Sequence, residues 1–292
     1  MTSGPSQYTP RLVTAADGTN IGVHEVEGTG SLIVALHGFT GSGSTMIPLL
    51  DAIRDGRPAL AVDLVGHGQS DAPEYLDSYS MPSVVDQVLS LIGPRNPGTV
   101  HLVGYSMGGR IALSMAARAP WYFASITTLS SSPGIDDPAE RAKRHDSDLA
   151  LADRLVEVGV AAFIDEWLTT PLFASYVASL DDDGRRATVS ARLRNSATGL
   201  ANSLRGTGTG AMAPVWTPLG SLHSPLLALA GELDSKFATI AHEMADIALF
   251  GTASIVADAG HVLHEENLPE IAAIVSSFLQ SCEDTTAKDT PG

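Results

Sequence analysis

Short, continuous apolar runs alternate along the chain with longer segments whose apolar residues recur at helical spacing. Continuous runs of this length are typical of strands that are buried on both faces of a parallel sheet. A turn at Asp17-Gly18 predicts that residues 12–26 form a hairpin, which precedes the parallel strands in the chain. The runs predict strands at residues 31–36, 59–64, 100–103, 225–230 and 253–256, and residues 125–129 are expected to form the strand that follows 100–103.

Helical segments separate these strands, so the pattern predicts an α/β fold with a mostly parallel sheet flanked by helices. From residue 136 to about 218 the pattern is helical and contains no convincing buried strand. An insertion of this kind predicts a helical cap over the carboxyl edge of the sheet, where open α/β sheets bind ligands. The expected division is a core of residues 11–133 and 219–282, a cap of residues 134–218, and flexible tails at 1–10 and 283–292.

The length and composition fit a single large domain with an insertion better than two equal domains. No run approaches the roughly 20 apolar residues of a membrane span, and the first ten residues lack the pattern of a secretory signal. The one cysteine, Cys282, rules out an internal disulfide. These features together predict a cytoplasmic protein.

The formal net charge of −16 argues against nucleic acids and anionic membranes as partners. The positive charge is unevenly placed, because residues 134–218 hold nine of the 17 basic residues and only twelve of the 33 acidic ones. Arginines gathered in the insertion of an acidic protein suit an anionic ligand. They also suit solvated helix faces, and composition does not separate the two interpretations.

Gly104-Tyr105-Ser106-Met107-Gly108 joins the strand at 100–103 to a helical run, and it is the pattern of a nucleophile elbow. The tight turn requires small residues on both sides of the serine, and it exposes the hydroxyl beside a helix N-terminus. The N–H of Met107 is then free to stabilise an oxyanion. The loop after the strand at 31–36 supplies the second donor in such sites, and we assign that role to the N–H of Phe39.

An activated serine needs a histidine within hydrogen-bond reach and a carboxylate that orients this histidine. Asp234 and His261 each follow the end of a later strand, in the chain order that accompanies an elbow of this kind. Glu232 competes for the role of the acid, and His264 competes for that of the base. His37 and His67 are expected to brace loops, and His223 and His242 to lie on the surface. No cluster has the spacing of metal ligands, so we predict no metal.

With these residues in place, the chain resembles enzymes of the α/β-hydrolase fold. More narrowly, it resembles the 2-succinyl-6-hydroxy-2,4-cyclohexadiene-1-carboxylate synthases of menaquinone biosynthesis, over roughly residues 31–279. The arginine that closes the elbow is a detail that a general esterase does not require. The motifs that carry the resemblance are Gly104–Arg110, Glu140–Arg144, Trp167 with Pro171–Phe173, Gly231–Phe237, and Ala259–His261 followed by His264–Asn267.

The resemblance implies a lyase that eliminates pyruvate from a cyclohexene bearing three carboxylates, without a cofactor. Ser106, activated by His261 and Asp234, would then remove a ring proton as a general base. The partner would be a small anionic carboxylate, and the protein a monomer or a small homo-oligomer. Leu168 departs from an aromatic residue of some family members, which puts one pocket wall in doubt. The residues to which the family's substrate-binding role carries over are Tyr105, Arg110, Arg144, Trp167, Phe173 and Arg194.

Packing within the cap is an equally good interpretation of Phe173, and a surface ion pair is an alternative for Arg194. Two other functions stay open at this point. A serine hydrolase of esters or of carbon–carbon bonds in small acids would use the same three residues through an acyl-enzyme. A receptor without catalytic activity would bind a small ligand and not turn it over, although the complete set of three residues argues against it.

Overall fold

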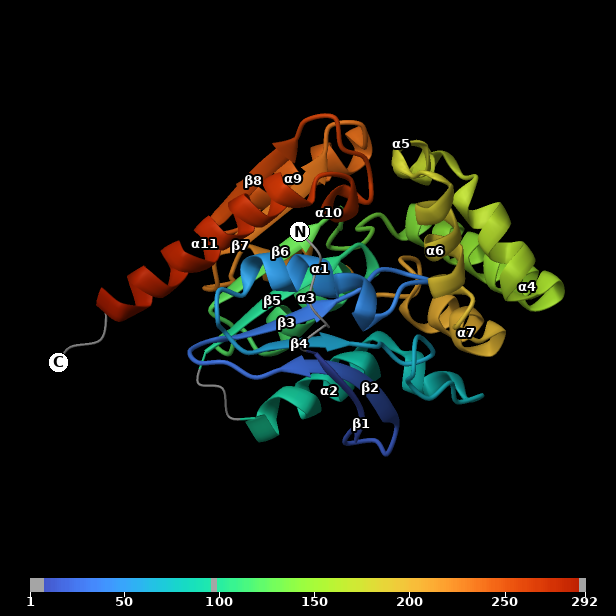
Figure 1. Cartoon of the computed structure of the whole chain (residues 1–292), viewed down its shortest axis with the longest axis horizontal. Coiled ribbons are helices and arrows are strands. Elements are labelled where there is room, and N and C mark those ends of the chain that lie inside the picture. Colours follow the sequence, from blue (N-terminus) through green and yellow to red (C-terminus); the bar gives the residue numbers. More distant parts are fainter. Residues whose placement is uncertain (1–7, 96–98, 289–292) are drawn as a thin grey trace.

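A computed structural model describes residues 8–95 and 99–288, and its centre is one eight-stranded sheet (Figure 1). The strand order is β1-β2-β4-β3-β5-β6-β7-β8. The first two strands pair antiparallel with each other, and β2 pairs antiparallel with β4, whereas all later pairs are parallel. The strands are β1 (Thr9–Thr14), β2 (Asn20–Val26), β3 (Leu32–Leu36), β4 (Ala59–Val62), β5 (Val100–Tyr105), β6 (Ser125–Leu129), β7 (Leu226–Gly231) and β8 (Gly251–Val256).

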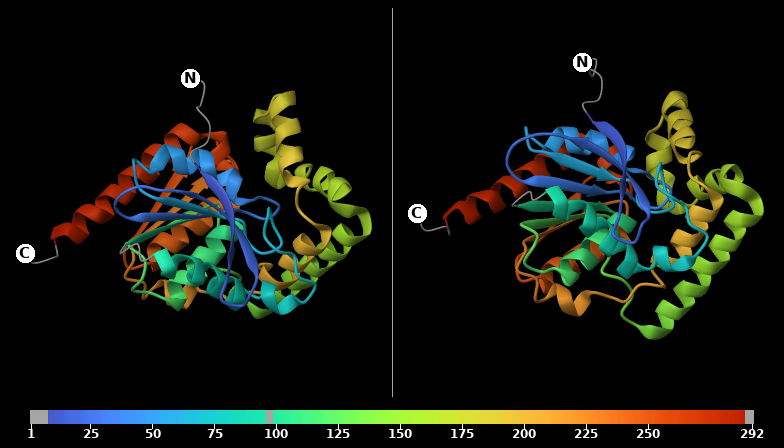
Figure 2. Two further views of the ribbon diagram at one scale, coloured as in Figure 1. Left: turned by 60° about the horizontal axis from the view of Figure 1, so that its bottom comes forward. Right: turned by 90° about the horizontal axis from the view of Figure 1, so that it is seen from below.

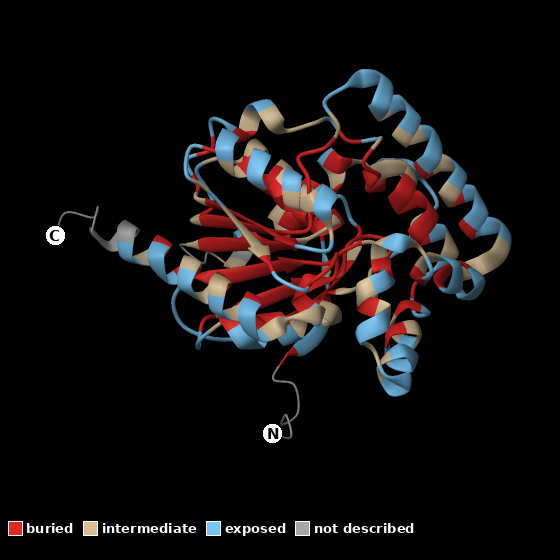
Figure 3. Cartoon of the chain, turned by 90° about the horizontal axis from the view of Figure 1, so that it is seen from above, coloured by how far each residue is buried: buried red, intermediate tan, exposed pale blue. Residues whose placement is uncertain are grey.

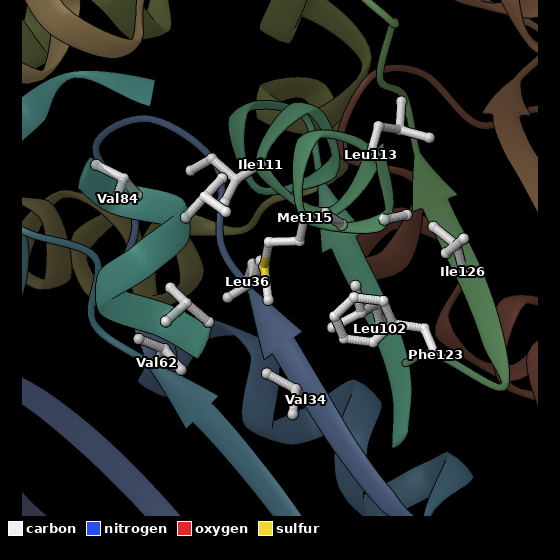
Figure 4. Packing of buried hydrophobic residues seen from close by; sticks show 14 of the residues in the cluster. Val34, Leu36, Val62, Val84, Leu102, Ile111, Leu113, Met115, Phe123 and Ile126 are labelled. Carbon is white, nitrogen blue, oxygen red and sulfur yellow. The ribbon is translucent and has the colours of Figure 1, made fainter. Parts of the chain in front are cut away.

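Helices cover both faces of the sheet, as the alternating pattern predicted. Along β3, Val34 and Leu36 pack into the apolar cluster under α2, α3 and α9, whereas Ile33 and Ala35 pack into the cluster under α1 and α11. Figure 4 shows Ile111, Leu113 and Met115 on α3 in the first of these clusters. The covering helices and short turns are α1 (Gly43–Ile53), η1 (Leu76–Tyr79), α2 (Met81–Ile92), η2 (Gly93–Arg95), α3 (Met107–Arg118), α8 (Trp216–Leu219), α9 (Ser235–Ile247), α10 (Leu263–Glu266) and α11 (Leu268–Lys288).

Burial on both faces explains why the central strands consist mainly of apolar residues, although the buried β6 also contains Ser125, Thr127 and Thr128. Every residue of β3, β4, β6 and β7 is buried (Figure 3). By contrast β8 lies at the edge of the sheet, and most of its residues are only partly buried. No helix in the described ranges is long and apolar enough to cross a membrane.

The predicted helical cap is present between β6 and β7, and it stands beyond one end of the strands in both views of Figure 2. Its longest helical segment is interrupted at Gly159, where φ is 77° and ψ is 167°, so this segment consists of two helices joined at a kink. The cap has an apolar cluster of its own, which includes Leu155, Phe163 and Leu200. The cap elements are α4 (Pro138–Leu168), η3 (Pro171–Phe173), α5 (Ala174–Ser179), α6 (Asp182–Arg192) and α7 (Ala197–Thr207).

The two ends of the cap meet at a narrow neck. The N–H of Val215 donates a hydrogen bond of 2.8 Å to the carbonyl of Pro133. Beside it, the indole N–H of Trp216 donates to the carbonyl of Gly134 at 3.0 Å. The chain therefore leaves the core and returns to it at one place.

The structure corrects the expected tails at both ends. Strand β1 begins at Thr9, inside the segment expected to be flexible, because residues 9–14 pair with β2. Helix α11 continues past Cys282 to Lys288. Within this extension the Glu283 carboxylate accepts hydrogen bonds from the Arg57 guanidinium at 2.7 and 3.0 Å, so the end of the helix is tied to the core. Residues 1–7 and 289–292 of the expected tails lie outside the described ranges.

Replacing Glu283 with glutamine is expected to lower the free energy of unfolding by about 1 kcal/mol at pH 7. Hydrogen bonds from Arg57 lower the pKa of Glu283 to about 2. A carboxyl group with a lowered pKa stabilises the folded state above its unfolded pKa of about 4.5, and this contribution is lost as the pH falls toward 2. Denaturant titrations at pH 7 and pH 3 would test this. The loss should shrink at pH 3, and Glu27→Gln, at an exposed position, should cost little at either pH.

Candidate active site

Ser106 occupies a strained turn between β5 and α3. Its backbone has φ of 50° and ψ of −108°, a conformation that residues other than glycine rarely adopt. A Cβ atom at position 108 would collide with the carbonyl of Leu36, and one at position 104 would collide with the backbone of Gly108. Glycine at both positions therefore lets the elbow form, as the sequence pattern predicted.

Three side chains from different strand ends meet at this turn. His261, in the loop after β8, places Nε2 3.1 Å from the Ser106 hydroxyl oxygen. Its Nδ1 lies 2.7 Å from the carboxylate of Asp234, which follows β7. Glu266 fixes the histidine loop, because its carboxylate accepts the N–H groups of Gly260 and Val262 at 3.0 Å each. The contacts that the sequence predicted between serine, histidine and aspartate are therefore present.

The competing residues take other positions. Glu232 is exposed, and its carboxylate accepts the N–H of Asp258 at 3.3 Å. His264 is buried against Tyr105, with ring centres 4.4 Å apart, and burial lowers its pKa to about 4. His37 braces two loops, since its Nε2 accepts the N–H of Leu64 at 3.0 Å. His67 is buried in the neighbouring loop, and burial lowers its pKa to about 3.

Two backbone amides lie beside Ser106 and are free to bind an anion. Met107 opens α3, so its N–H has no partner within the helix. Phe39 follows Gly38, and a Cβ atom at position 38 would contact the Ser106 side chain. Within the described ranges, neither N–H donates a hydrogen bond to another protein atom. This arrangement suits the two oxyanion donors that the sequence predicted.

A cavity of about 590 Å³ lies above Ser106, between the core and the cap. Its residues come from the elbow, the segment after β6, the cap helices and the start of α9. Ser106, His261 and Asp234 all reach it. Its lining also includes Phe39, Arg110, Ser132, Arg144, Asp148, Trp167, Leu172, Thr207, Thr209, Lys236 and Phe237.

The charges of this cavity are unevenly compensated. Arg144 donates from Nε to the buried Asp148 carboxylate at 2.7 Å. Arg110 donates from Nη2 to the carbonyl of Thr207 at 3.1 Å, whereas its Nε is buried and has no hydrogen-bond partner in the described structure. Burial, together with the positive charge of Arg144, lowers the pKa of Arg110 to about 10. A cation held in this way favours an anionic ligand.

The predicted substrate-binding residues fall into two groups. Arg110, Arg144 and Trp167 line the cavity, and Trp167 contacts the Phe39 ring edge to face at 5.7 Å between centres. Tyr105, Phe173 and Arg194 do not line it.

The second group differs from the expectation for physical reasons. Phe173 is buried in the cap cluster, with its ring centre 6.2 Å from that of His261. This position agrees with the alternative interpretation, in which Phe173 packs within the cap. Tyr105 packs under the histidine loop against His261 and His264. Arg194 is exposed in the turn just beyond α6, whereas Arg192, the last residue of that helix, is buried.

Sequence reasoning missed several cavity residues. Lys236 lies in the Gly231–Phe237 motif, but no spacing rule distinguishes it from a surface lysine. Asp148 and Thr207 are on different cap helices, and only the packing of α4 against α7 brings them together. Within the described ranges, no group of three or more His, Cys, Asp or Glu side chains is placed to hold a metal ion.

Comparison with known proteins supports the class that the fold and the site define. The model of the alpha/beta hydrolase fold family matches residues 31–268, so this is a protein of that fold with a serine, histidine and aspartate in contact. A 2-succinyl-6-hydroxy-2,4-cyclohexadiene-1-carboxylate synthase of Klebsiella pneumoniae (strain 342) is 31% identical, covering 85% of this chain and 94% of the relative. A Bacillus subtilis (strain 168) protein provisionally assigned that name is 36% identical, covering 92% and 98%. The chain belongs to the family of these synthases.

Solved structures give the same result. MenH from S. aureus superposes with a TM-score of 0.84 and 29% sequence identity, covering 89% of this chain and 98% of that one. An esterase from Exiguobacterium antarcticum superposes with a TM-score of 0.79 at 17% identity, covering 93% and 100%. At that level of identity the esterase shows the shared fold alone.

Proposed function

We propose that the protein eliminates pyruvate from 2-succinyl-5-enolpyruvyl-6-hydroxy-3-cyclohexene-1-carboxylate and leaves 2-succinyl-6-hydroxy-2,4-cyclohexadiene-1-carboxylate. The observation that carries the proposal is the incompletely paired Arg110 in the cavity, one helical turn from Ser106. An arginine there suits a substrate with several carboxylates. Membership of the synthase family supports the same reaction and its place in menaquinone biosynthesis.

Ser106 acts as a base in the proposed mechanism. Its hydroxyl proton passes to Nε2 of His261, which is 3.1 Å away, while the oxygen removes the ring proton next to the succinyl carbonyl. Asp234 holds the imidazole in orientation and stabilises the imidazolium that forms. The electrons of the broken C–H bond move through the ring and break the C–O bond to enolpyruvate. The imidazolium then returns a proton, and the released enol becomes pyruvate.

The two free amides and the arginines would bind different negatively charged groups of the substrate. Proton removal places negative charge on the succinyl carbonyl oxygen, which the N–H groups of Phe39 and Met107 would stabilise. Arg110 and Arg144 would hold carboxylates of the bound substrate, and Trp167 would form an apolar wall against the ring. In this role the arginines attract a multiply charged anion to a protein whose net charge is −16.

The test is pyruvate release from the enolpyruvyl precursor, followed with a coupled dehydrogenase. Because the precursor also loses pyruvate spontaneously, the reference is the rate without protein. Release far above this background supports the proposal. Release at the background rate, together with a burst of alcohol from simple aryl esters, would identify a serine hydrolase instead. The cytoplasmic location and the small or monomeric assembly stay predictions.

A further inference from the structure

Lys236 extends into the active-site cavity from the core side, and the proposed function leaves it without a role. It is exposed and lines the cavity together with Ser106 and Arg110. Its ammonium lies 5.6 Å from the centre of the Phe237 ring, and that ring lies 4.8 Å from the ring of His261. One aromatic ring therefore separates this cation from the histidine of the site.

The position of Lys236 in its helix is electrostatically unfavourable. It is the second residue of α9, a helix of 13 residues whose first turn contains no acidic side chain. The N-terminal turn of a helix carries partial positive charge, so a cation there is destabilising. Within the described ranges, no carboxylate forms an ion pair with Lys236, although the cavity contains two acids. Asp148 is paired with Arg144 and Asp234 with His261, so the lysine charge is free for a ligand.

The cations of the cavity approach it from different elements. Arg110 comes from α3, Arg144 from the cap helix α4, and Lys236 from α9 (Figure 1). The proposed substrate bears three carboxylates, one on the ring, one on the succinyl group and one on the enolpyruvyl group. Arg110 is partly buried and Lys236 is exposed, so their charges are suited to different groups. A weakly hydrated guanidinium suits a carboxylate held inside the cavity, whereas a strongly hydrated, flexible ammonium suits one held close to water.

We propose that Lys236 binds the carboxylate of the enolpyruvyl group and stabilises the enolpyruvate anion as it leaves. This inference rests on the proposed elimination and adds a third cation to its site. When the C–O bond breaks, both electrons go to the departing oxygen, and the ammonium offsets the charge that develops there. The product then diffuses from the rim of the cavity, where Lys236 is exposed to water.

The test compares Lys236→Gln, Lys236→Arg and the matched control Lys143→Gln. Lys143 is exposed on α4 and does not line the cavity, and its replacement by glutamine makes the same change in net charge. Lys236→Gln is expected to lower kcat/KM for pyruvate release about tenfold, and Lys236→Arg to restore most of it. Lys143→Gln should keep the wild-type value. Equal behaviour of the two glutamine variants would overturn the assignment.

Two inhibitors identify which carboxylate the lysine binds. Pyruvate, as a product inhibitor, should bind about tenfold more weakly to Lys236→Gln than to the wild type. A benzoate with a succinyl substituent carries the other two carboxylates and no enolpyruvyl group, so its inhibition constant should be unchanged. Weakened binding of the benzoate would overturn the assignment to the departing group. If the wild-type protein releases no pyruvate above background, the proposed function itself fails, which is a different result from either of these.

Discussion

Ser106→Ala is expected to lower the rate of pyruvate release by about 10³-fold, with little change in substrate affinity. The hydroxyl is the group placed to remove the ring proton, and His261, 3.1 Å away, cannot reach the same point from behind it. The carboxylates are held by other residues, so the substrate should still bind. Stopped-flow measurement of release, and calorimetric titration with the succinyl-substituted benzoate, would measure the two effects separately.

The same variant distinguishes a base from a nucleophile. In the proposed elimination no acyl-enzyme forms, so intact-protein mass spectrometry of the wild type during turnover should show the unmodified mass. A serine hydrolase would show an adduct at Ser106 that the alanine variant lacks. An accumulating adduct in the wild type, or near-normal release by Ser106→Ala, would refute the general-base assignment.

Arg110→Ala is expected to lower kcat/KM for the enolpyruvyl substrate by about 10²-fold without unfolding the protein. Losing a charge-assisted contact to a carboxylate accounts for an effect of this size. The guanidinium makes one hydrogen bond to the protein, to Thr207, and its Nε has no partner in the described structure. The substitution therefore removes one hydrogen bond to the protein, and it also removes a partly buried charge that destabilises the folded state.

A matched control for this variant lies on the same helix. Arg118 is exposed, near the end of α3, and makes only a loose ion pair with Asp86 at 3.7 Å. Arg118→Ala should keep wild-type kcat/KM. Thermal unfolding should give Arg110→Ala a midpoint close to that of the wild type. An arginine variant that turns over substrate normally would remove the main reason for preferring the synthase to an esterase.

The sheet and the three contacting residues were predictable because strong local constraints encode them. Strands buried on both faces favour apolar runs, and the elbow needs glycine at positions 104 and 108 because backbone atoms occupy the space of a side chain. Asp234 and His261 were identified from strand ends and chain order alone. The strands and the elbow are each encoded within about ten residues of sequence, and the order of the three residues along the chain can be read without knowledge of the tertiary packing.

The cap residues were less predictable because their roles depend on which way each helix faces. Where α6 ends also matters, because Arg192 is its last residue and is buried, whereas Arg194 lies in the turn beyond it and is exposed. The sequence could not decide whether Phe173 packs within the cap or binds substrate, because the answer depends on where the neighbouring helices lie. The extension of α11 to Lys288 was missed because the sequence there is polar, whereas the ion pair of Glu283 with Arg57 ties it to the core.

The neck between Pro133 and Val215 makes the cap a replaceable unit. Since both ends of the insertion leave the core at hydrogen-bonded positions, a short turn from residue 134 to 215 could join them while every strand keeps its neighbours. Duplication, loss or exchange of this segment would change which molecules reach Ser106 and leave the reactive groups in place. Exchange of the coding segment between these two junctions would therefore be a route by which such proteins acquire new substrates.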